Sequence, residues 1–240
     1  MVEKVFGIGF LGGRAMDTEK RISIIIPAKN ESESLPEMLA EIPKDLVHEI
    51  IVVDGHSTDG TEDVVKKLGH RVVQQDGDGY GMAVNTGLNM ATGELITFMD
   101  ADGSYDPMAL RPLMREIDQG YDVVFCSRYL PEAGSDDDTA IRYMGNKLFT
   151  WLLRKLHGVQ ITDALFLYIL AKKEIFANIN MTSKSFDWCI EFPVRVHQAG
   201  LKYKEIPSRE RKRIAGQSKV NAFSDGLNIL MAMLRLKKEK

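Results

Sequence analysis

The 240-residue sequence has only two cysteines and no long hydrophobic run. Cys126 and Cys189 are too few for a disulfide framework, and their spacing matches neither a zinc site nor a CxxC redox pair. The longest apolar run, at residues 164–171, is far shorter than the roughly 18 residues that a membrane-spanning helix needs. We therefore expect a chain that works in the reducing cytoplasm, with no spanning helix and no export signal.

The sequence also lacks an excess of charge of one sign. Lys and Arg number 31 against 34 for Asp and Glu, a formal net charge of −3, which argues against a partner such as nucleic acid. Hydrophobic residues make up 44% of the chain and charged residues 27%. This balance is ordinary for a globular protein and excludes a disordered or collagen-like chain.

Short apolar runs alternate with longer helical segments from Arg21 onward, which is typical of a mostly parallel sheet built from βαβ units. We expect strands at 21–26, 49–53, 71–75, 95–99 and 122–126, and helices at about 36–42, 61–68, 83–91 and 107–118. After Ser127 the pattern predicts helices at about 139–157, 172–178, 187–199 and 223–236, and a strand at 201–206.

No linker interrupts this pattern, so the sequence predicts a single α/β domain in which helices flank the sheet. We place this domain at residues 21–220. Residues 1–20 are interpreted as a leader or a short extra element, and residues 221–240 as an amphipathic helix with a basic end.

Two aspartates directly follow the strand at 95–99, in the string MDADGSYDP. Asp100 and Asp102, with the small Ala101 between them, stand at the carboxyl end of a buried strand, where open α/β sheets bind ligands. Carboxylate oxygens suit Mg²⁺ or Mn²⁺, which also bridges the phosphate oxygens of a nucleotide. Taken alone, the pair is explained equally well by a turn in which an aspartate caps the next helix.

Three other polar loops are expected at the same edge of the sheet. They are PAKNE (27–31), VVDGHSTDGT (52–61) and the glycine-rich GDGYG (77–81), which leads into a helix whose first amides favour an anion. The G-x-G-x-x-G fingerprint is absent after the first strand, which disfavours an NAD enzyme.

In this order, PAKNE, VVDGHSTDGT, GYGMAVNTGLNMATGE and FMDADGSYDP resemble glycosyltransferase family 2, with its GT-A fold. The resemblance covers about residues 21–220 and is strongest to the branch of dolichol-phosphate mannose synthases and polyprenyl-phosphate glycosyltransferases. It implies a nucleotide-diphosphate-sugar donor, a UDP- or GDP-hexose, and a divalent metal, Mg²⁺ or Mn²⁺, on Asp100 and Asp102. It further implies that the nucleotide sugar is contacted by Pro27, Ala28, Asn30, Glu31, Asp54, Asp100, Ala101 and Asp102.

The chain departs from the pattern of this family at several positions. Gly55 stands where many relatives have a second acid, and Tyr80 stands where a Lys or Arg is frequent, which removes one cation for phosphate. Leu167 stands where the family pattern has a small residue, and Ile169 stands where it has a basic residue. We interpret this more apolar segment as either additional core or a lipid-facing surface.

Cations in the second half of the chain suit a phosphate ligand, because Arg holds phosphate oxygens bidentately. The resemblance implies that Arg128 and Arg142 grip an acceptor phosphate. It also implies that the string RIAGQSK, with Arg213, Ser218 and Lys219, closes over the phosphates. Without the resemblance, these side chains could equally be solvated surface charges.

The nature of the acceptor decides whether a catalytic base is needed. A phosphate monoester has a second pKa of about 6, so it is already nucleophilic and needs positioning and charge neutralisation. A hydroxyl acceptor would instead need a carboxylate to take its proton. Asp187 and Glu191, four residues apart on one helix face, are the candidates, and we count Asp102, Arg128 and Asp187 as the candidate catalytic residues.

The sequence thus predicts an inverting, metal-dependent glycosyltransferase that moves a hexose to a polyprenyl (dolichyl-type) phosphate. Two alternatives stay open: a family member with a soluble or glycan hydroxyl acceptor, and a sugar-nucleotide-binding module without activity. A sugar-1-phosphate nucleotidyltransferase is disfavoured, because PAKNE is not the glycine-rich, Arg-bearing loop that such an enzyme needs after its first strand.

The expected last helix bears on localisation. Its apolar stripe contains Phe223, Leu227, Leu230, Met231 and Leu234, and its end is basic, with Arg235, Lys237, Lys238 and Lys240. Such a helix fits peripheral contact with the cytoplasmic face of an anionic membrane. It equally fits packing onto the sheet with a basic end that complements the helix dipole.

Overall fold

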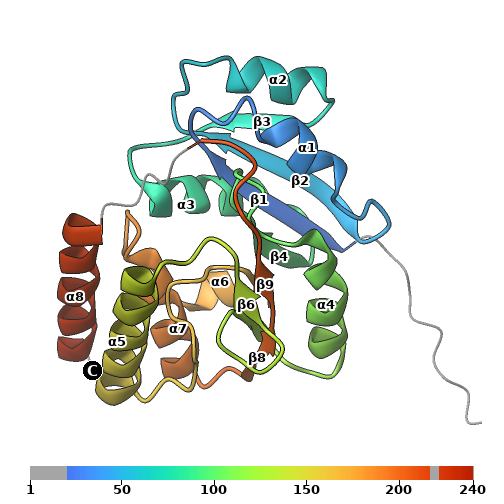
Figure 1. Ribbon diagram of the computed structural model, residues 1–240. Helices are drawn as coiled ribbons and strands as arrows, with labels where there is room; N and C mark the ends of the chain where they lie inside the picture. Colours follow the sequence, from blue (N-terminus) through green and yellow to red (C-terminus); the bar gives the residue numbers. More distant parts are fainter. Residues whose placement is uncertain (1–20, 217–221, 240) are drawn as a thin grey trace, which may run out of the picture.

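The computed structural model describes residues 21–216 and 222–239, with side chains of the last segment from residue 225. Its centre is a seven-stranded sheet with the order β3-β2-β1-β4-β7-β5-β8 (Figure 1). The strands are β1 (Ile22–Ala28), β2 (Val47–Asp54), β3 (Arg71–Gln74), β4 (Leu95–Phe98), β5 (Val123–Ser127), β7 (Ile169–Lys172) and β8 (Tyr203–Pro207). All neighbours are parallel except β7, which runs antiparallel to β4 and β5.

Helices cover both faces of the sheet, which is why its central strands are apolar on both sides. One face packs against α1 (Leu35–Ala40), α2 (Thr61–Lys67), the short η1 (Pro107–Ala109) and α4 (Leu110–Asp118). The other face packs against α3 (Tyr80–Met90), α6 (Ile175–Asn178) and α7 (Trp188–Gln198). This arrangement confirms the predicted single α/β domain with a mostly parallel sheet.

Two long helices form a further layer beyond α7. They are α5 (Ala140–His157) and α8 (Ala222–Lys238), which contact α7 and each other and lie side by side at one edge of the molecule (Figure 1). The buried side of α8 carries Ile229, Met233 and Leu236, whereas Leu227, Met231 and Leu234 of the predicted stripe are exposed. The apolar stripe expected from the sequence is therefore mostly a solvent-facing side of α8, not its packing side.

The apolar segment around Leu167 and Ile169 is core, as one of the two interpretations predicted, and not an exposed lipid-facing surface. Both side chains are buried, and Ile169 begins β7, opposite Phe125 of β5. The hydroxyl of Thr97 donates a hydrogen bond of 2.6 Å to the carbonyl oxygen of Ile169. This strand was not predicted, because a strand buried on both faces has no alternation of polar and apolar residues.

A second, two-stranded parallel sheet pairs β6 (Gly134–Ser135) with β9 (Arg209–Glu210). The sequence did not predict it, because both strands are two residues long and lie far apart in the chain. It brings the acidic residues 136–138 beside the segment 209–214 at the front of the molecule (Figure 1).

Several predictions fall at the limits of the described ranges. Residues 1–20, Ser218 and Lys219 lie outside them, and the proposed domain boundaries stay predictions. Within 21–216 and 222–239, no helix combines the length and the apolar character that crossing a bilayer demands.

Candidate active site

Two cavities open beside the aspartates that follow β4. Cavity A, of about 380 Å³, lies at the carboxyl ends of β1 and β4. Cavity B, of about 310 Å³, extends from the same aspartates to α5 and α8. The two cavities share six lining residues: Tyr80, Asp100, Asp102, Phe186, Arg213 and Asp225. A ligand in cavity A therefore meets a ligand in cavity B at the predicted aspartate pair.

Negative charge is concentrated where the cavities meet. Burial of the carboxyl and the nearby charges of Asp102 and Glu210 raise the pKa of Asp100 above its ordinary value. The Asp102 carboxylate accepts a hydrogen bond from the Ser104 amide at 3.0 Å and lies 3.3 Å from Nη1 of Arg213. For Asp100 and Asp102 themselves, the one guanidinium of Arg213 thus balances only part of the charge, and a further cation would be stabilised here.

The aspartate pair fits a divalent cation that shares its coordination with a substrate. Across the part of the chain that the structure describes, His, Cys, Asp and Glu side chains form no cluster of three that could hold an ion. Mg²⁺ commonly binds through one or two carboxylates together with substrate phosphates and water. The donor set of Asp100 and Asp102 matches that mode rather than a closed protein cage.

The residues predicted to contact the nucleotide sugar fall into two groups. Six of them line cavity A: Pro27, Ala28, Glu31, Asp100, Ala101 and Asp102. Asn30 and Asp54 line neither cavity. Instead, Asn30 Oδ1 accepts a hydrogen bond of 2.8 Å from the Thr58 amide, and Asp54 accepts one of 3.1 Å from the Ser57 amide. Asn30 connects the loops that follow β1 and β2, and Asp54 holds the start of the loop that follows β2. Contact of either side chain with a nucleotide stays a prediction.

Buried Asp54 has one unused acceptor. No donor from the described residues lies within hydrogen-bond distance of its Oδ1, although Oδ2 accepts from Gln74 Nε2 at 3.1 Å. A buried carboxylate oxygen without a partner is costly. A donor group of a ligand or a water molecule would remove that cost.

Two glycines at the start of α3, Gly79 and Gly81, are required by close approach of another backbone segment. A Cβ on Gly79, whose φ is +102°, would lie 2.5 Å from the Lys184 carbonyl oxygen, and one on Gly81 would lie 2.7 Å from that of Ser183. The approach places Tyr80 against Phe186, with ring centroids 5.9 Å apart. Both rings line both cavities. From the sequence, Tyr80 was notable only because it stands where the family often has a Lys or Arg. Phe186 was not identified as a site residue.

The segment 209–214 lies directly on the aspartate loop. The amide of Arg211 donates to the Ser104 carbonyl oxygen and that of Ile214 to the Asp102 carbonyl oxygen, both at 2.8 Å. Gly103 has a φ of +77°, and a Cβ there would lie 2.3 Å from Cδ1 of Ile214. Because the two segments are so close, Arg213 reaches the aspartates, as the predicted phosphate-binding role requires.

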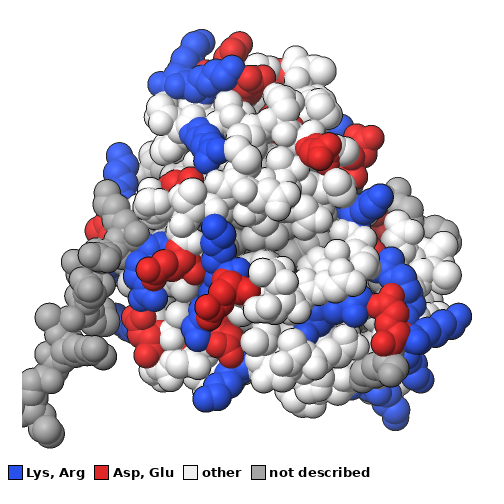
Figure 2. Space-filling view, turned by 180° about the vertical axis from the view of Figure 1, so that it is seen from behind, with Lys and Arg blue, Asp and Glu red and all other residues white. Residues whose placement is uncertain are grey.

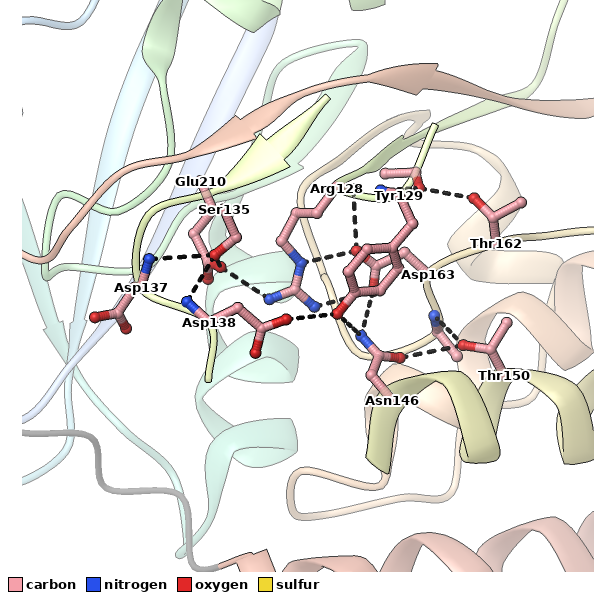
Figure 3. Close-up of polar contacts among 12 residues, drawn as sticks. Arg128, Tyr129, Ser135, Asp137, Asp138, Asn146, Thr150, Thr162, Asp163 and Glu210 are labelled. Carbon is pink, nitrogen blue, oxygen red and sulfur yellow. Dashed lines mark hydrogen bonds and ion pairs between the residues drawn. The ribbon is translucent and has the colours of Figure 1, made fainter. Parts of the chain in front are cut away.

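Arg128, predicted to grip a phosphate, is held by two acids (Figure 3). Its Nε and Nη2 donate to Asp163 at 2.7 and 2.9 Å, and its Nη1 donates to Glu210 at 3.0 Å. Its guanidinium also lies 4.7 Å from the ring centroid of Phe166. Arg128 lines cavity B, but these bonds use three of its five N–H groups and leave at most two for a ligand.

Two further predicted cations share one aspartate. Nη1 of Arg142, in the first turn of α5, lies 3.4 Å from Oδ2 of Asp137. Nη2 of Arg213 lies 3.2 Å from the same oxygen. All three residues line cavity B. The structure thus brings three of the predicted phosphate-binding residues, Arg128, Arg142 and Arg213, to one cavity.

The candidate base positions lie elsewhere. Asp187, just before α7, accepts a hydrogen bond of 2.8 Å from Ser183 Oγ and lies 3.5 Å from Arg235. Fully buried Glu191 accepts bonds from both amides of 182–183 and from Arg195. Neither carboxylate lines a cavity. A catalytic role for Asp187 stays a prediction. Asp225 of α8 lines both cavities, but it was not predicted as a site residue, because the sequence placed α8 apart from the site.

Comparisons with known proteins agree on one family. The family model described as Glycosyl transferase family 2 matches residues 23–179. A protein of Mycobacterium tuberculosis named an uncharacterized glycosyltransferase is 34% identical over 205 residues, or 85% of this chain and 92% of the relative. The dolichyl-phosphate hexose transferase of Haloferax volcanii is 27% identical over 217 residues, or 90% of this chain and 93% of the relative.

A solved structure has the same fold. It is glucosyl-3-phosphoglycerate synthase from Mycobacterium tuberculosis in complex with Mn²⁺, UDP and glucosyl-3-phosphoglycerate. The TM-score is 0.73 and the identity 20%, over 91% of this chain and 80% of that one. At this identity the likeness shows the fold, which is the predicted GT-A fold, and not the substrate.

Proposed function

The chain belongs to glycosyltransferase family 2, as its motifs predicted, and we propose that it transfers a hexose from UDP or GDP to a polyprenyl phosphate. One observation carries this proposal. Cavity B joins a charged end, where Arg128, Arg142 and Arg213 lie among carboxylates, to an apolar end between α5 and α8. A phosphate on an isoprenoid chain has the same two halves. The Haloferax relative, which is named a dolichyl-phosphate hexose transferase, supports this acceptor class.

Cavity A is the proposed donor site. It opens at the carboxyl ends of β1 and β4, which is where open α/β sheets bind nucleotides. Pro27, Ala28 and Glu31 contribute its wall on the β1 side. The diphosphate would lie at the junction of the two cavities, next to Asp100 and Asp102.

A divalent cation, Mg²⁺ or Mn²⁺, bound with the donor would supply charge neutralisation for the diphosphate that departs. Asp100 and Asp102 would hold that cation. Arg213 lies 3.3 Å from Asp102, so its guanidinium is positioned beside the same phosphates. These residues stabilise negative charge where it grows as the sugar–phosphate bond breaks.

The acceptor side needs positioning more than a base. A phosphate dianion is already a nucleophile at neutral pH, and arginines can align it for attack on the anomeric carbon from cavity B. Attack from the side opposite the departing diphosphate inverts the anomeric configuration. Neither Asp187 nor Glu191 lines cavity A or cavity B, which favours this phosphate acceptor over a hydroxyl acceptor.

A direct assay tests the proposal. The protein is incubated with radiolabelled UDP- and GDP-hexoses, Mg²⁺ or Mn²⁺, and either a polyprenyl phosphate or the matching polyprenol. We expect labelled lipid with the phosphate and none with the alcohol. Labelled product only with hydroxyl acceptors would overturn the proposed acceptor class, and donor binding without transfer to any acceptor would favour a binding module.

A lipid acceptor requires that cavity B be reached from a membrane, and α5 and α8 have surfaces suited to this. Exposed apolar side chains follow a helical spacing on α5 (Ile141, Met144, Leu148 and Trp151) and on α8 (Leu227, Met231 and Leu234). Arg154, Lys155, Lys237 and Lys238 are exposed on the same two helices. Seen from behind, Lys and Arg side chains gather at the lower right, the side on which these helices lie (Figure 2). We propose peripheral contact of α5 and α8 with an anionic membrane.

Replacing Leu148 with glutamate should lower binding to anionic liposomes by at least about tenfold. The substitution removes an apolar contact and adds repulsion by anionic lipid. Flotation with phosphatidylserine-containing vesicles measures the bound fraction. Leu68→Glu is the matched control, because Leu68 is a comparably exposed leucine (43% against 55%) at the end of α2, far from α5. Equal binding of the two variants would contradict a membrane surface on α5.

A further inference from the structure

The acidic loop at residues 136–138 reaches into cavity B. Each of its aspartates has a partner: Asp136 pairs with Arg209 on the surface, and the Asp138 carboxylate accepts a hydrogen bond of 2.8 Å from the Tyr129 hydroxyl. Asp137 differs from both, because its Oδ2 lies between two guanidinium groups (Figure 3 shows the loop). It is the only one of the three whose carboxylate meets two cations of the proposed acceptor site.

One oxygen of Asp137 meets two guanidinium groups, as an oxygen of a bound phosphate would. That oxygen receives Nη2 of Arg213 at 3.2 Å and Nη1 of Arg142 at 3.4 Å. The other terminal nitrogen of Arg213, Nη1, lies 3.3 Å from Oδ2 of Asp102. An anion in this position therefore lies between the first turn of α5 and the aspartates at the junction of the cavities. That is the place that a nucleophilic phosphate would have to occupy.

We propose that Asp137 occupies the place of the acceptor's phosphate and that the phosphate displaces it on binding. This inference rests on the proposed polyprenyl-phosphate acceptor. A carboxylate offers one charge, and partly exposed ion pairs of this kind are individually weak. A phosphate monoester brings nearly two charges and three oxygens to the same arginines. The competition therefore favours the phosphate.

The loop is built so that the carboxylate can leave without unfolding. Ser135 Oγ accepts hydrogen bonds from the amides of Asp137 and Asp138 at 3.3 and 2.9 Å, and it donates to Glu210. These bonds involve the backbone and the β6–β9 pair, not the Asp137 side chain. The side chain is 23% exposed and that of Arg142 is 45% exposed, so both have room to move.

The acceptor's monophosphate, rather than the donor's diphosphate, is the displacing group. Asp137 and Arg142 line cavity B and do not line cavity A. Only Arg213 of this trio lines both. Loss of the Asp137 charge should therefore change the affinity for the acceptor more than the affinity for the donor.

The variant Asp137→Asn tests the inference with Asp136→Asn as its control. Both substitutions remove one charge from the same loop, but Asp136 pairs with Arg209 outside the cavity. We expect Asp137→Asn to lower the KM for polyprenyl phosphate by about fivefold, as the loss of two weak ion pairs predicts. The KM for the nucleotide sugar should stay within about twofold, and Asp136→Asn should match the parent in both.

The outcomes separate the inference from the proposed function. An unchanged or higher acceptor KM in Asp137→Asn would overturn the displacement, and so would an equal effect of Asp136→Asn. If Asp137→Asn lowered only the KM for the donor, the position of the Asp137 carboxylate would belong to the donor's diphosphate, and the inference would be overturned. Calorimetry with geranyl phosphate reads binding without turnover. Tighter binding by Asp137→Asn, with no sugar transfer by the parent, would retain the displacement and overturn the proposed function.

Discussion

Replacing Asp102 with asparagine is expected to lower kcat for sugar transfer by about a thousandfold, with little change in stability. The loss is large because the carboxylate charge acts where the departing diphosphate gains charge, at the meeting point of two cavities. The fold should persist, since the asparagine Oδ1 can still accept the hydrogen bond that Asp102 takes from the Ser104 amide at 3.0 Å.

The measurement is transfer rate against Mn²⁺ concentration, together with a thermal unfolding curve. Asp106→Asn is the matched control, because Asp106 lies four residues along the same loop, lines neither cavity and accepts a bond of 3.0 Å from the Met108 amide. We expect this variant to keep most of the activity. More than a tenth of the parental rate in Asp102→Asn, or an equal loss in Asp106→Asn, would contradict the role given to the pair.

The donor half of the site was predictable from sequence because local signals define it. β1 and β4 are short apolar runs that end in polar residues, and parallel strands bring such ends to one edge of the sheet. Pro27, Ala28, Asp100 and Asp102 therefore meet at cavity A, as predicted. Asn30 and Asp54 show the limit of this reasoning. Their place at the strand ends was predictable, but their hydrogen bonds to Thr58 and Ser57 depend on side-chain directions that sequence patterns do not give.

The acceptor half was less predictable because pairings between distant segments build it. The β6–β9 pair joins residues 134–135 to 209–210, and strands of two residues leave no hydrophobic period to detect. Asp225, on α8, reaches both cavities through packing of α8 against α5 and α7. The sequence did not single out Asp137, since its partners Arg142 and Arg213 come from other elements.

Arg128 illustrates how a predicted ligand-binding residue can also be structural. Its side chain is 11% exposed and that of Asp163 is fully buried. Asp163 also accepts a hydrogen bond of 2.6 Å from Asn146 of α5. Arg128 extends this network to Glu210 of β9, so it joins the sheet, α5 and the small second sheet. A buried charged pair of this kind need not add net stability, but removal of one partner leaves the other charge uncompensated.

Replacing Arg128 with alanine should therefore reduce the free energy of unfolding by about 3–5 kcal/mol, the usual cost of breaking a buried ion pair. Urea unfolding measures this change. Arg142→Ala is the control, because Arg142 is 45% exposed and its ion pair to Asp137 is 3.4 Å long. We expect that control to lose less than about 1 kcal/mol. Both variants should raise the KM for the acceptor, since both arginines line cavity B.

A double variant separates the two roles of Arg128. Arg128→Gln with Asp163→Asn removes the Arg128 charge and the fully buried Asp163 charge together and leaves Glu210, which is 14% exposed. At least half of the lost stability should therefore return compared with Arg128→Ala. The acceptor KM should stay high, because glutamine carries no charge for the phosphate. Recovered stability with a parental KM would show that Arg128 only supports the fold. No recovery of stability would mean that the cost of Arg128→Ala comes from lost packing on Phe166 and not from the charge left on Asp163.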